Sequence, residues 1–365
     1  MKTLSIKTLV FSLILILTMP SMSFASNYSV SNEVNVSRDE ADLVVGTFIQ
    51  SNGFPESMPQ LTSVSPMYDM NDELLAYYYK FNHQYVLVSA NKEYSPVLAA
   101  SPAGSLDITE LNSNGKLYYF GGISAAQALN TEEIIINSSE KVNNESKSMV
   151  DSNVGLAKNP NSEASWDHYL KTSAERGTAL AMMQKKLTMT TFDQYGTGVT
   201  NQASACGPAT MAAISEYWRV YRGFNLVPSP YFYGSQTNMI NHFYNEHGGT
   251  IIGMGSATMQ MGLEFHHDEF YASADADPIT GYSSYRTEIN NNRPVAVKFD
   301  RKFTFYEPNN DYAYPYHWTV GKGFSYDNFD SMFIVNDNTG DEDHQEHYID
   351  FPTNEPILSL VKFSM

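Results

Sequence analysis

A long polar stretch divides this chain and limits how it can fold. From Asn137 to Ser165 the sequence reads NSSEKVNNESKSMVDSNVGLAKNPNSEAS, with almost no large apolar residue. Such a stretch cannot bury enough apolar surface to offset the conformational entropy lost on folding. It predicts an exposed, protease-sensitive linker over residues 138–165, between folded regions at residues 26–137 and 166–365.

The first residues have the pattern of an export signal. Lys2 and Lys7 precede an apolar run, Leu9 to Leu17, that is too short to span a bilayer, and residues 23–25 (Ser-Phe-Ala) suit a signal peptidase. We therefore expect residues 1–25 to be a signal peptide and the chain to be secreted, with no membrane span in its mature form. Removing the two lysines changes the net charge from −18 to −20, which argues against nucleic-acid and anionic-membrane partners.

Residues 26–137 have the pattern of a small α+β unit. Helical spacing of apolar residues covers 38–52, and short alternating runs predict the strands that follow. These runs are 74–81, 84–89, 97–100 and 116–120. The region contains no group of residues that indicates catalysis, and we expect it to have a structural or regulatory role.

Cys206 is the only cysteine of the chain, so within an exported protein it has no partner for an internal disulfide. The residues after it, Met211 to Trp218, have the spacing of an amphipathic helix. This predicts that the thiol lies at a helix N-terminus, where the helix dipole and free N–H groups stabilise a thiolate. The alternative is that Cys206 is simply a small buried apolar residue.

The strands predicted after this helix supply partners for the thiol. The apolar runs are 295–299, 316–324 and 331–337. His317 can act as the base, and Asp337, or its neighbour Asn336, can orient the imidazole. Gln202 and the Cys206 N–H can stabilise an oxyanion. In the alternative interpretation, His317 is a core histidine, Asp337 a turn residue and Gln202 an ordinary loop residue.

These motifs resemble a known group of enzymes. The runs Gln202-x-x-x-Cys206-Gly-Pro-Ala-Thr, Asn-Arg-Pro-Val at 292–295, His317 in Tyr-His-Trp-Thr-Val-Gly, and Val-Asn-Asp337 are similar to papain-like peptidases of the double-glycine, bacteriocin-processing type. The resemblance covers about residues 186–351. It implies an α+β fold in which a nucleophile helix packs on an antiparallel sheet. It also implies Cys206 as nucleophile, His317 as base, Asp337 as orienting residue and Gln202 as oxyanion donor.

The N-terminal region has a shorter resemblance. Tyr-Val-Leu-Val-Ser-Ala at 85–90 and Ser-Pro-Val-Leu-Ala-Ala at 95–100 look similar to the prodomains of streptopain-like peptidases. This implies that residues 26–137 inhibit the peptidase as an intramolecular partner. We therefore expect a secreted cysteine peptidase made as a zymogen, with peptide or protein substrates. An acyltransferase or amidase for isopeptide or cell-wall bonds, and an inactive binding or inhibitor protein, are the alternatives.

Histidine pairs elsewhere in the chain suggest a metal only weakly. His266-His267-Asp268 would point to opposite faces of a strand, and His344 and His347 would share a face only on a helix. We therefore predict no metal and no cofactor. Gly-rich runs at 248–255 lack the strand-loop-helix context of a nucleotide site.

Overall fold

The computed structural model describes residues 34–52, 60–134, 156–171, 183–250, 253–270, 273–300, 305–307, 310–313, 316–326, 329–340 and 346–365. All of them belong to one compact unit, Val34–Met365. The predicted signal peptide and most of the predicted linker lie outside the described residues.

The fold is a mixture of helices and sheet, as the sequence predicted. The strands are β1 (Leu61–Tyr68), β2 (Leu74–Phe81), β3 (Tyr85–Ser89), β4 (Val97–Ala103), β5 (Asp107–Glu110), β6 (Lys116–Gly121), β7 (Ser124–Ala128), β8 (Met183–Lys186), β9 (Asp275–Ile279), β10 (Val295–Asp300), β11 (Phe305–Glu307), β12 (Asn310–Ala313), β13 (Tyr316–Tyr326), β14 (Ser331–Asn336), β15 (Glu346–Asp350) and β16 (Leu358–Ser364). Strands β11 and β12 pair only with each other in the described part of the chain.

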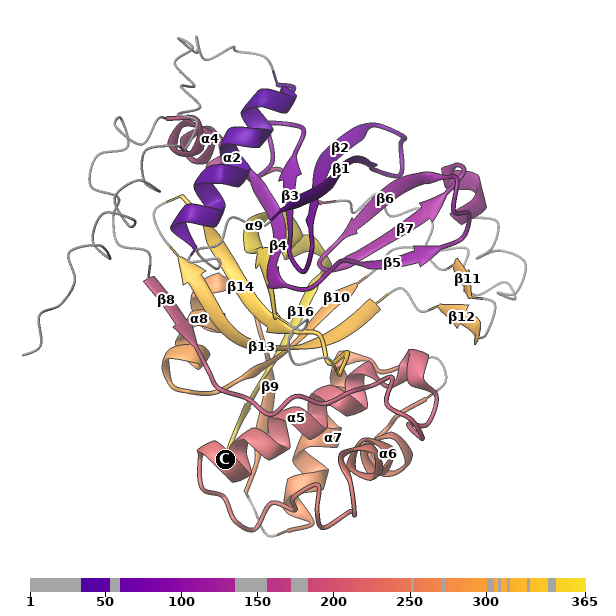
Figure 1. Cartoon of the computed structure of the whole chain (residues 1–365). Helices are drawn as coiled ribbons and strands as arrows, with labels where there is room; N and C mark the ends of the chain where they lie inside the picture. Colours follow the sequence, from indigo (N-terminus) through magenta and orange to yellow (C-terminus); the bar gives the residue numbers. More distant parts are fainter. Residues whose placement is uncertain are drawn as a thin grey trace, which may run out of the picture. The chain divides into compact units, whose positions relative to one another are not determined.

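The other strands form one large, mostly antiparallel sheet. Its order is β5-β7-β6-β1-β2-β3-β4-β15-β14-β13-β10-β16-β9, and β8 pairs with β13 outside this path (Figure 1). The predicted strands at 74–81, 84–89, 97–100, 116–120, 295–299, 316–324 and 331–337 are confirmed within a few residues. The sequence did not predict β1, β7, β9, β11, β12 or β16.

Helices cover parts of this sheet. They are α2 (Arg38–Ser51), α4 (Ser162–Leu170), α5 (Cys206–Tyr221), α6 (Gln236–Glu246), α7 (Ser256–Asp268), α8 (Gly281–Asn290) and α9 (Phe351–Asn354), with short 3₁₀ turns η1 (Gln202–Ser204) and η2 (Glu355–Ile357). Helices α6 and α7 both pack on α5, and α5 packs on β13 and β10 (Figure 1). This group of three helices positions the cysteine.

Local sequence explains where α2 begins. The Ser37 side chain accepts a hydrogen bond from the Glu40 N–H, and the Glu40 carboxylate accepts one from the Ser37 N–H, which makes a capping box. Lys92, in the turn between β3 and β4, donates to the same carboxylate at 2.7 Å. The helix predicted at 38–52 is therefore confirmed and tied to the sheet.

The end of the predicted linker is folded. Helix α4 begins at Ser162, inside the range 138–165 that the sequence predicted to be an exposed linker. Its Trp166 and Tyr169 are buried, the Trp166 indole donates to the Tyr94 carbonyl at 3.0 Å, and the Tyr169 hydroxyl donates to Asp330. These contacts are made by residues just after the polar stretch, and they hold α4 against the rest of the fold.

The N-terminal strands and the C-terminal strands meet between β4 and β15. These two strands pair antiparallel, with Ala99 opposite Ile349 and Ala100 opposite Tyr348. One core cluster accordingly contains apolar residues from both regions, including Leu87 and Val335.

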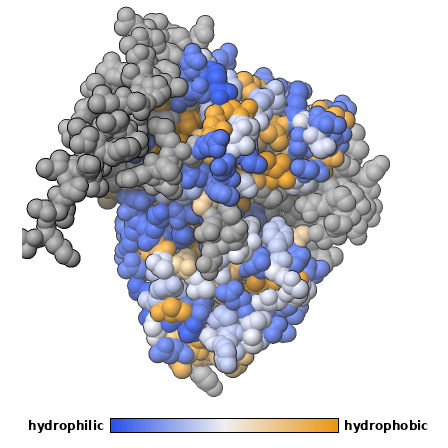
Figure 2. All heavy atoms as spheres, viewed as in Figure 1, coloured by the Kyte–Doolittle hydropathy of each residue, from blue (hydrophilic) through white to orange (hydrophobic). Residues whose placement is uncertain are grey.

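The described residues include no helix long and apolar enough to cross a membrane. On the face shown in Figure 2, hydrophobic residues form separate groups among hydrophilic ones.

Candidate active site

Cys206 is the first residue of α5, as the sequence predicted. Pro208 is accommodated in the first helical turn, because the N–H groups of that turn have no partner within the helix and proline's fixed φ suits a helix start. No side chain caps the N-terminus at Ala205, and the Cys206 side chain is only 3% exposed. The thiol therefore lies, shielded from water, beside backbone N–H groups that can stabilise negative charge.

Contacts around Gly207 fix the start of α5 against the histidine strand. A Cβ atom on Gly207 would lie 3.4 Å from Cδ1 of Trp318 and 3.0 Å from Sδ of Met254. The Trp318 indole in turn donates to the Met254 carbonyl at 2.8 Å. The residue after Cys206 is thus packed against the residue after His317.

His317 lies on β13 and is buried, with 6% of its surface exposed. Its Nε2 is 3.1 Å from the backbone carbonyl oxygen of Asp337, the first residue after β14. A carbonyl can only accept, so Nε2 carries the proton and Nδ1 is the basic nitrogen of the neutral ring. The structure brings His317 and Asp337 together through the main chain of Asp337.

The carboxylate of Asp337 has other partners. Its Oδ2 is 2.7 Å from Nε2 of His347 on β15, and its Oδ1 accepts from the Thr339 N–H and hydroxyl at 3.1 and 2.9 Å. Nδ1 of His347 is 3.0 Å from the Tyr85 hydroxyl on β3. His347 and Tyr85 are completely buried. The Asp337 carboxylate therefore holds His347, and the contact between Asp337 and His317 is made by the main-chain carbonyl of Asp337.

The sequence pattern suggests only metal binding as a function for His347. Nothing in its local sequence indicates a contact with Asp337, because it depends on the pairing of β14 with β15. Asn336, the alternative orienting residue, uses its Oδ1 to accept from the Asn338 N–H at 2.9 Å. The amide of Asn338 donates to the Thr210 hydroxyl at 2.9 Å, four residues after Cys206 on α5. This bond ties the loop after β14 to α5.

Gln202 lies in the 3₁₀ turn before α5, and its amide nitrogen already donates two hydrogen bonds. The acceptors are the carbonyl oxygens of Tyr195 at 2.7 Å and Gly196 at 3.0 Å. Gln202 would have to give up one of these bonds to bind an oxyanion, so its role stays a prediction. Gln194 is a second amide candidate that the sequence did not single out.

Gln194 is 1% exposed and lies between the two sides of the site. Its N–H donates to the Asn338 carbonyl at 2.9 Å, and its side-chain nitrogen is 3.5 Å from the Gln202 carbonyl, which is a weak contact. Its Oε1 has no hydrogen-bond partner among the described residues. Gln194 is therefore a buried amide, held by weak side-chain contacts, that links Gln202 to Asn338.

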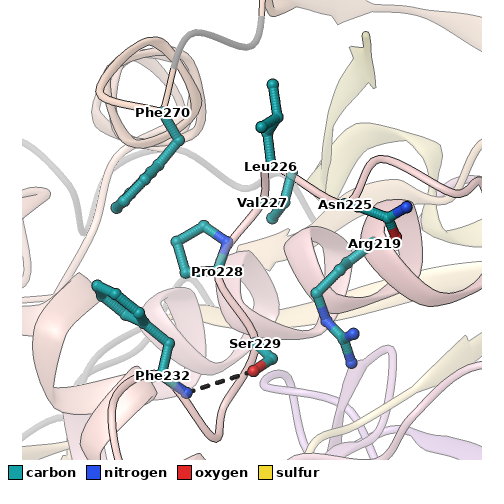
Figure 3. A pocket seen from close by; sticks show the side chains of 8 residues that line it. All are labelled: Arg219, Asn225, Leu226, Val227, Pro228, Ser229, Phe232 and Phe270. Atoms are coloured by element: carbon teal, nitrogen blue, oxygen red, sulfur yellow. Dashed lines mark hydrogen bonds between the residues drawn. The ribbon is translucent and has the colours of Figure 1, made fainter.

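A cavity of about 300 Å³ lies elsewhere on the molecule. Figure 3 shows Phe232 and Phe270 on one side of it and Arg219 on the other. Arg219 follows Cys206 by 13 residues on α5, which at 1.5 Å per residue is about 20 Å along the helix. This cavity therefore does not adjoin the thiol.

Part of the chain matches a known family. Residues 186–355 match the model of the Peptidase_C39 like family. No curated protein matches the chain.

Three solved structures are similar over parts of the chain. A putative C39-like peptidase from Bacillus anthracis is 11% identical over 50% of this chain and 98% of its own, with a TM-score of 0.34. Digestive procathepsin L 3 of the Tenebrio molitor larval midgut is 14% identical over 58% and 83%, with a TM-score of 0.30. A fragment of Prevotella intermedia prointerpain A is 12% identical over 82% and 97%, with a TM-score of 0.40.

Proposed function

We propose that this chain is a cysteine peptidase that cleaves peptide bonds through a thioester on Cys206. The observation that carries the proposal is the hydrogen bond from Nε2 of His317 to the Asp337 carbonyl. His317 lies on β13, the strand against which the Cys206 helix is packed. This bond fixes the tautomer in which Nδ1 is basic, and an imidazole of this kind can accept a thiol proton. The match of residues 186–355 to a peptidase family supports the same chemistry.

The residues have defined roles in this mechanism. His317 takes the proton of Cys206, and the thiolate attacks the carbonyl carbon of the substrate. The N–H of Cys206 and the amide of Gln194 or Gln202 stabilise the oxyanion. His317 then protonates the leaving amine and later removes a proton from the water that hydrolyses the thioester. The Asp337 carbonyl stabilises the imidazolium formed in each half of the reaction.

A labelling experiment tests this mechanism. An electrophilic cysteine-peptidase probe should alkylate Cys206 rapidly in the parent chain and at least a hundredfold more slowly in a His317→Ala variant. His83→Ala, a histidine outside the site, is the matched control and should label at the parent rate. Equal, slow labelling of all three proteins would refute catalysis and favour an inactive binding protein.

A product analysis then separates hydrolysis from acyl transfer. A peptide library is incubated with the parent chain and with Cys206→Ser, with and without an added primary amine. A peptidase should give mainly free carboxyl termini. Products dominated by the added amine would instead indicate an acyltransferase.

We also propose that the chain is exported and that residues 26–137 act as an inhibitory prodomain. The export pattern of residues 1–25 supports the first statement. The pairing of β4 with β15, and the Tyr85–His347–Asp337 chain of hydrogen bonds, support the second, because they connect the N-terminal region to the candidate site.

Mapping the N-termini of the protein in culture medium over time tests both proposals. A first N-terminus at residue 26 and a later one within residues 135–182 are the expected products. Loss of only the second product in Cys206→Ser would show self-cleavage. Retention of an intact N-terminus at Met1 in washed cells would contradict export.

A further inference from the structure

Four side chains that the proposed mechanism does not use meet at the ends of α6 and α7. They are His242, His247, His266 and Glu269, and each places one ligand atom within 4.8 Å of the others. The closest pair is Nε2 of His242 and Nε2 of His247, 3.1 Å apart. We call this group the histidine cluster.

Helix geometry brings these residues together. His242 lies on α6 and His247 is the C-cap of that helix, whereas His266 and Glu269 are three residues apart at the C-terminal end of α7. Residues at this spacing share one face of a helix. The C-terminal ends of helices carry partial negative charge, which favours a bound cation.

His266 points to a ligand independently of this arrangement. The side chain is 0% exposed, and neither ring nitrogen has a hydrogen-bond partner among the described residues. Leaving a buried polar group unpaired costs about 1–3 kcal/mol, so native proteins usually satisfy it. His267 differs, because its Nδ1 is 2.6 Å from the Leu263 carbonyl.

The environment keeps these imidazoles neutral, which is the form that binds a metal. Burial lowers the pKa of His266 to about 2 and that of His247 to about 4, and the neighbouring histidines add to both effects. Burial also lowers the pKa of His242. All three rings therefore offer nitrogen lone pairs at neutral pH.

Aromatic rings enclose the inner side of the cluster. Tyr233 stacks on His242 with centroids 4.7 Å apart, and the rings of Phe243 and Phe270 lie 4.3 and 5.5 Å from His266. Phe270 also forms a wall of the cavity in Figure 3. Glu269 is exposed, so the cluster has one side that solvent can reach.

We propose that His242, His247, His266 and Glu269 bind one divalent transition-metal ion, with zinc as the best match. Three imidazole nitrogens and one carboxylate oxygen are ligands that zinc takes in tetrahedral sites. Zinc–ligand bonds of about 2.0–2.1 Å place ligand atoms about 3.4 Å apart, so atoms that lie within 4.8 Å of one another can reach one ion by small side-chain rotations.

The site has a structural role, because four protein ligands complete its coordination and the thiol lies elsewhere. Gly262 on α7 lies close to both neighbouring helices. A Cβ at this position would meet Sδ of Met211 on α5 at 2.7 Å and the carbonyl of His247, the C-cap of α6, at 2.8 Å. A metal that joins α6 to α7 would therefore brace both helices against the helix that carries Cys206.

Zinc binding by the full-length chain tests the proposal. The Cys206→Ser chain is used, because it removes the thiol as a competing ligand, and bound metal is stripped with a chelator before zinc is titrated. We expect about one zinc per chain and a melting temperature that rises with zinc. With Co²⁺ as the probe, we expect the visible d–d bands of a tetrahedral site.

Two variants at the solvent side of the cluster locate the ion. His242→Gln and Glu269→Gln should each weaken zinc binding at least tenfold. Asp268→Asn, which removes the neighbouring exposed charge on α7, is the control and should bind like the parent. Equal melting temperatures of the metal-free proteins would show that the variants fold.

Several results would overturn the proposal. One is the absence of zinc binding and of any zinc-dependent change in melting temperature. Another is zinc binding that survives both cluster variants but is lost in a Cys206→Ser/His317→Ala chain, which would place the ion at the candidate active site.

Discussion

Replacing Gly207 with alanine tests how α5 is held against the histidine strand. The new Cβ would lie 3.0 Å from Sδ and 3.1 Å from Cβ of Met254, closer than the 3.5–4.0 Å or so of ordinary carbon contacts. Gly207 also precedes Pro208 inside a helix, where a Cβ on the preceding residue is unfavourable. Both effects oppose the gain in helix propensity.

The magnitudes decide the sign of the change. Overpacking a filled core costs about 1–3 kcal/mol, and alanine gains at most about 1 kcal/mol over glycine in a helix interior. Gly46→Ala is the matched control, because Gly46 lies within α2 and its new Cβ would meet nothing within 4 Å. We expect Gly46→Ala to stabilise the chain by about 0.5–1 kcal/mol and Gly207→Ala to destabilise it by about 1–2 kcal/mol.

Urea unfolding measures both stabilities, and alkylation of Cys206 measures the effect on the site. A displacement of about 1 Å near reacting groups can reduce a rate about a hundredfold, so we expect alkylation of Gly207→Ala to slow about tenfold. Gly46→Ala should label at the parent rate. If Gly207→Ala were as stable as Gly46→Ala and labelled as fast as the parent, the contact between Gly207, Met254 and Trp318 would not position the thiol.

Two further predictions concern buried polar groups. Burial raises the pKa of Asp350 from 3.8 to about 6, so the folded chain binds more protons than the unfolded chain between these values and loses stability as pH rises through this window. Asp350→Asn keeps an oxygen to cap the Thr353 N–H and should remove this loss. Its free energy of unfolding should exceed that of the parent chain by about 2–3 kcal/mol at pH 7, but not at pH 4. A difference in the free energy of unfolding, measured with urea, that stays constant between the two proteins from pH 4 to pH 6 would contradict this. Tyr85→Phe removes the hydroxyl 3.0 Å from the buried His347 and should lower the free energy of unfolding by about 1–3 kcal/mol. Tyr77→Phe, whose hydroxyl donates to the Val36 carbonyl at a half-buried position, is the control, and an equal, small change in both variants would show that the His347 bond adds nothing.

Local patterns predicted most of the elements around the site. Cys206-Gly207-Pro208 gave the start of α5, because the turn chemistry of a helix start is readable in sequence. Alternating apolar residues gave β10, β13 and β14. These elements are short-range features, so a single sequence is sufficient to predict them.

Long-range pairing could not be predicted in the same way. The Tyr85 hydroxyl and His347 are 262 residues apart and meet only because β4 pairs with β15. The sequence also suggested the carboxylate of Asp337 as the partner of His317, but the end of β14 presents its carbonyl instead. Which group of a residue faces a partner depends on strand register, and no local pattern contains it.

The histidine cluster was missed for a different reason. The strand expected at His266 and His267 is wrong, because both lie on α7. The buried face of that helix is formed by Met259, Gly262 and Leu263, followed by the two histidines. Histidine does not count as apolar in an analysis of periodicity, so the apolar pattern does not predict the last turn of this helix face.

The pairing of β4 with β15 has a consequence for any maturation of this protein. Proteolysis in the segment between the two regions would leave both fragments joined by the main-chain hydrogen bonds of this ladder and by the core that they share. The two fragments of a cleaved chain would therefore remain associated until β4 separates from β15. If the ladder then opened, β15 would become an exposed sheet edge that could pair with another extended strand. Binding of a peptide and self-association would then compete for this edge.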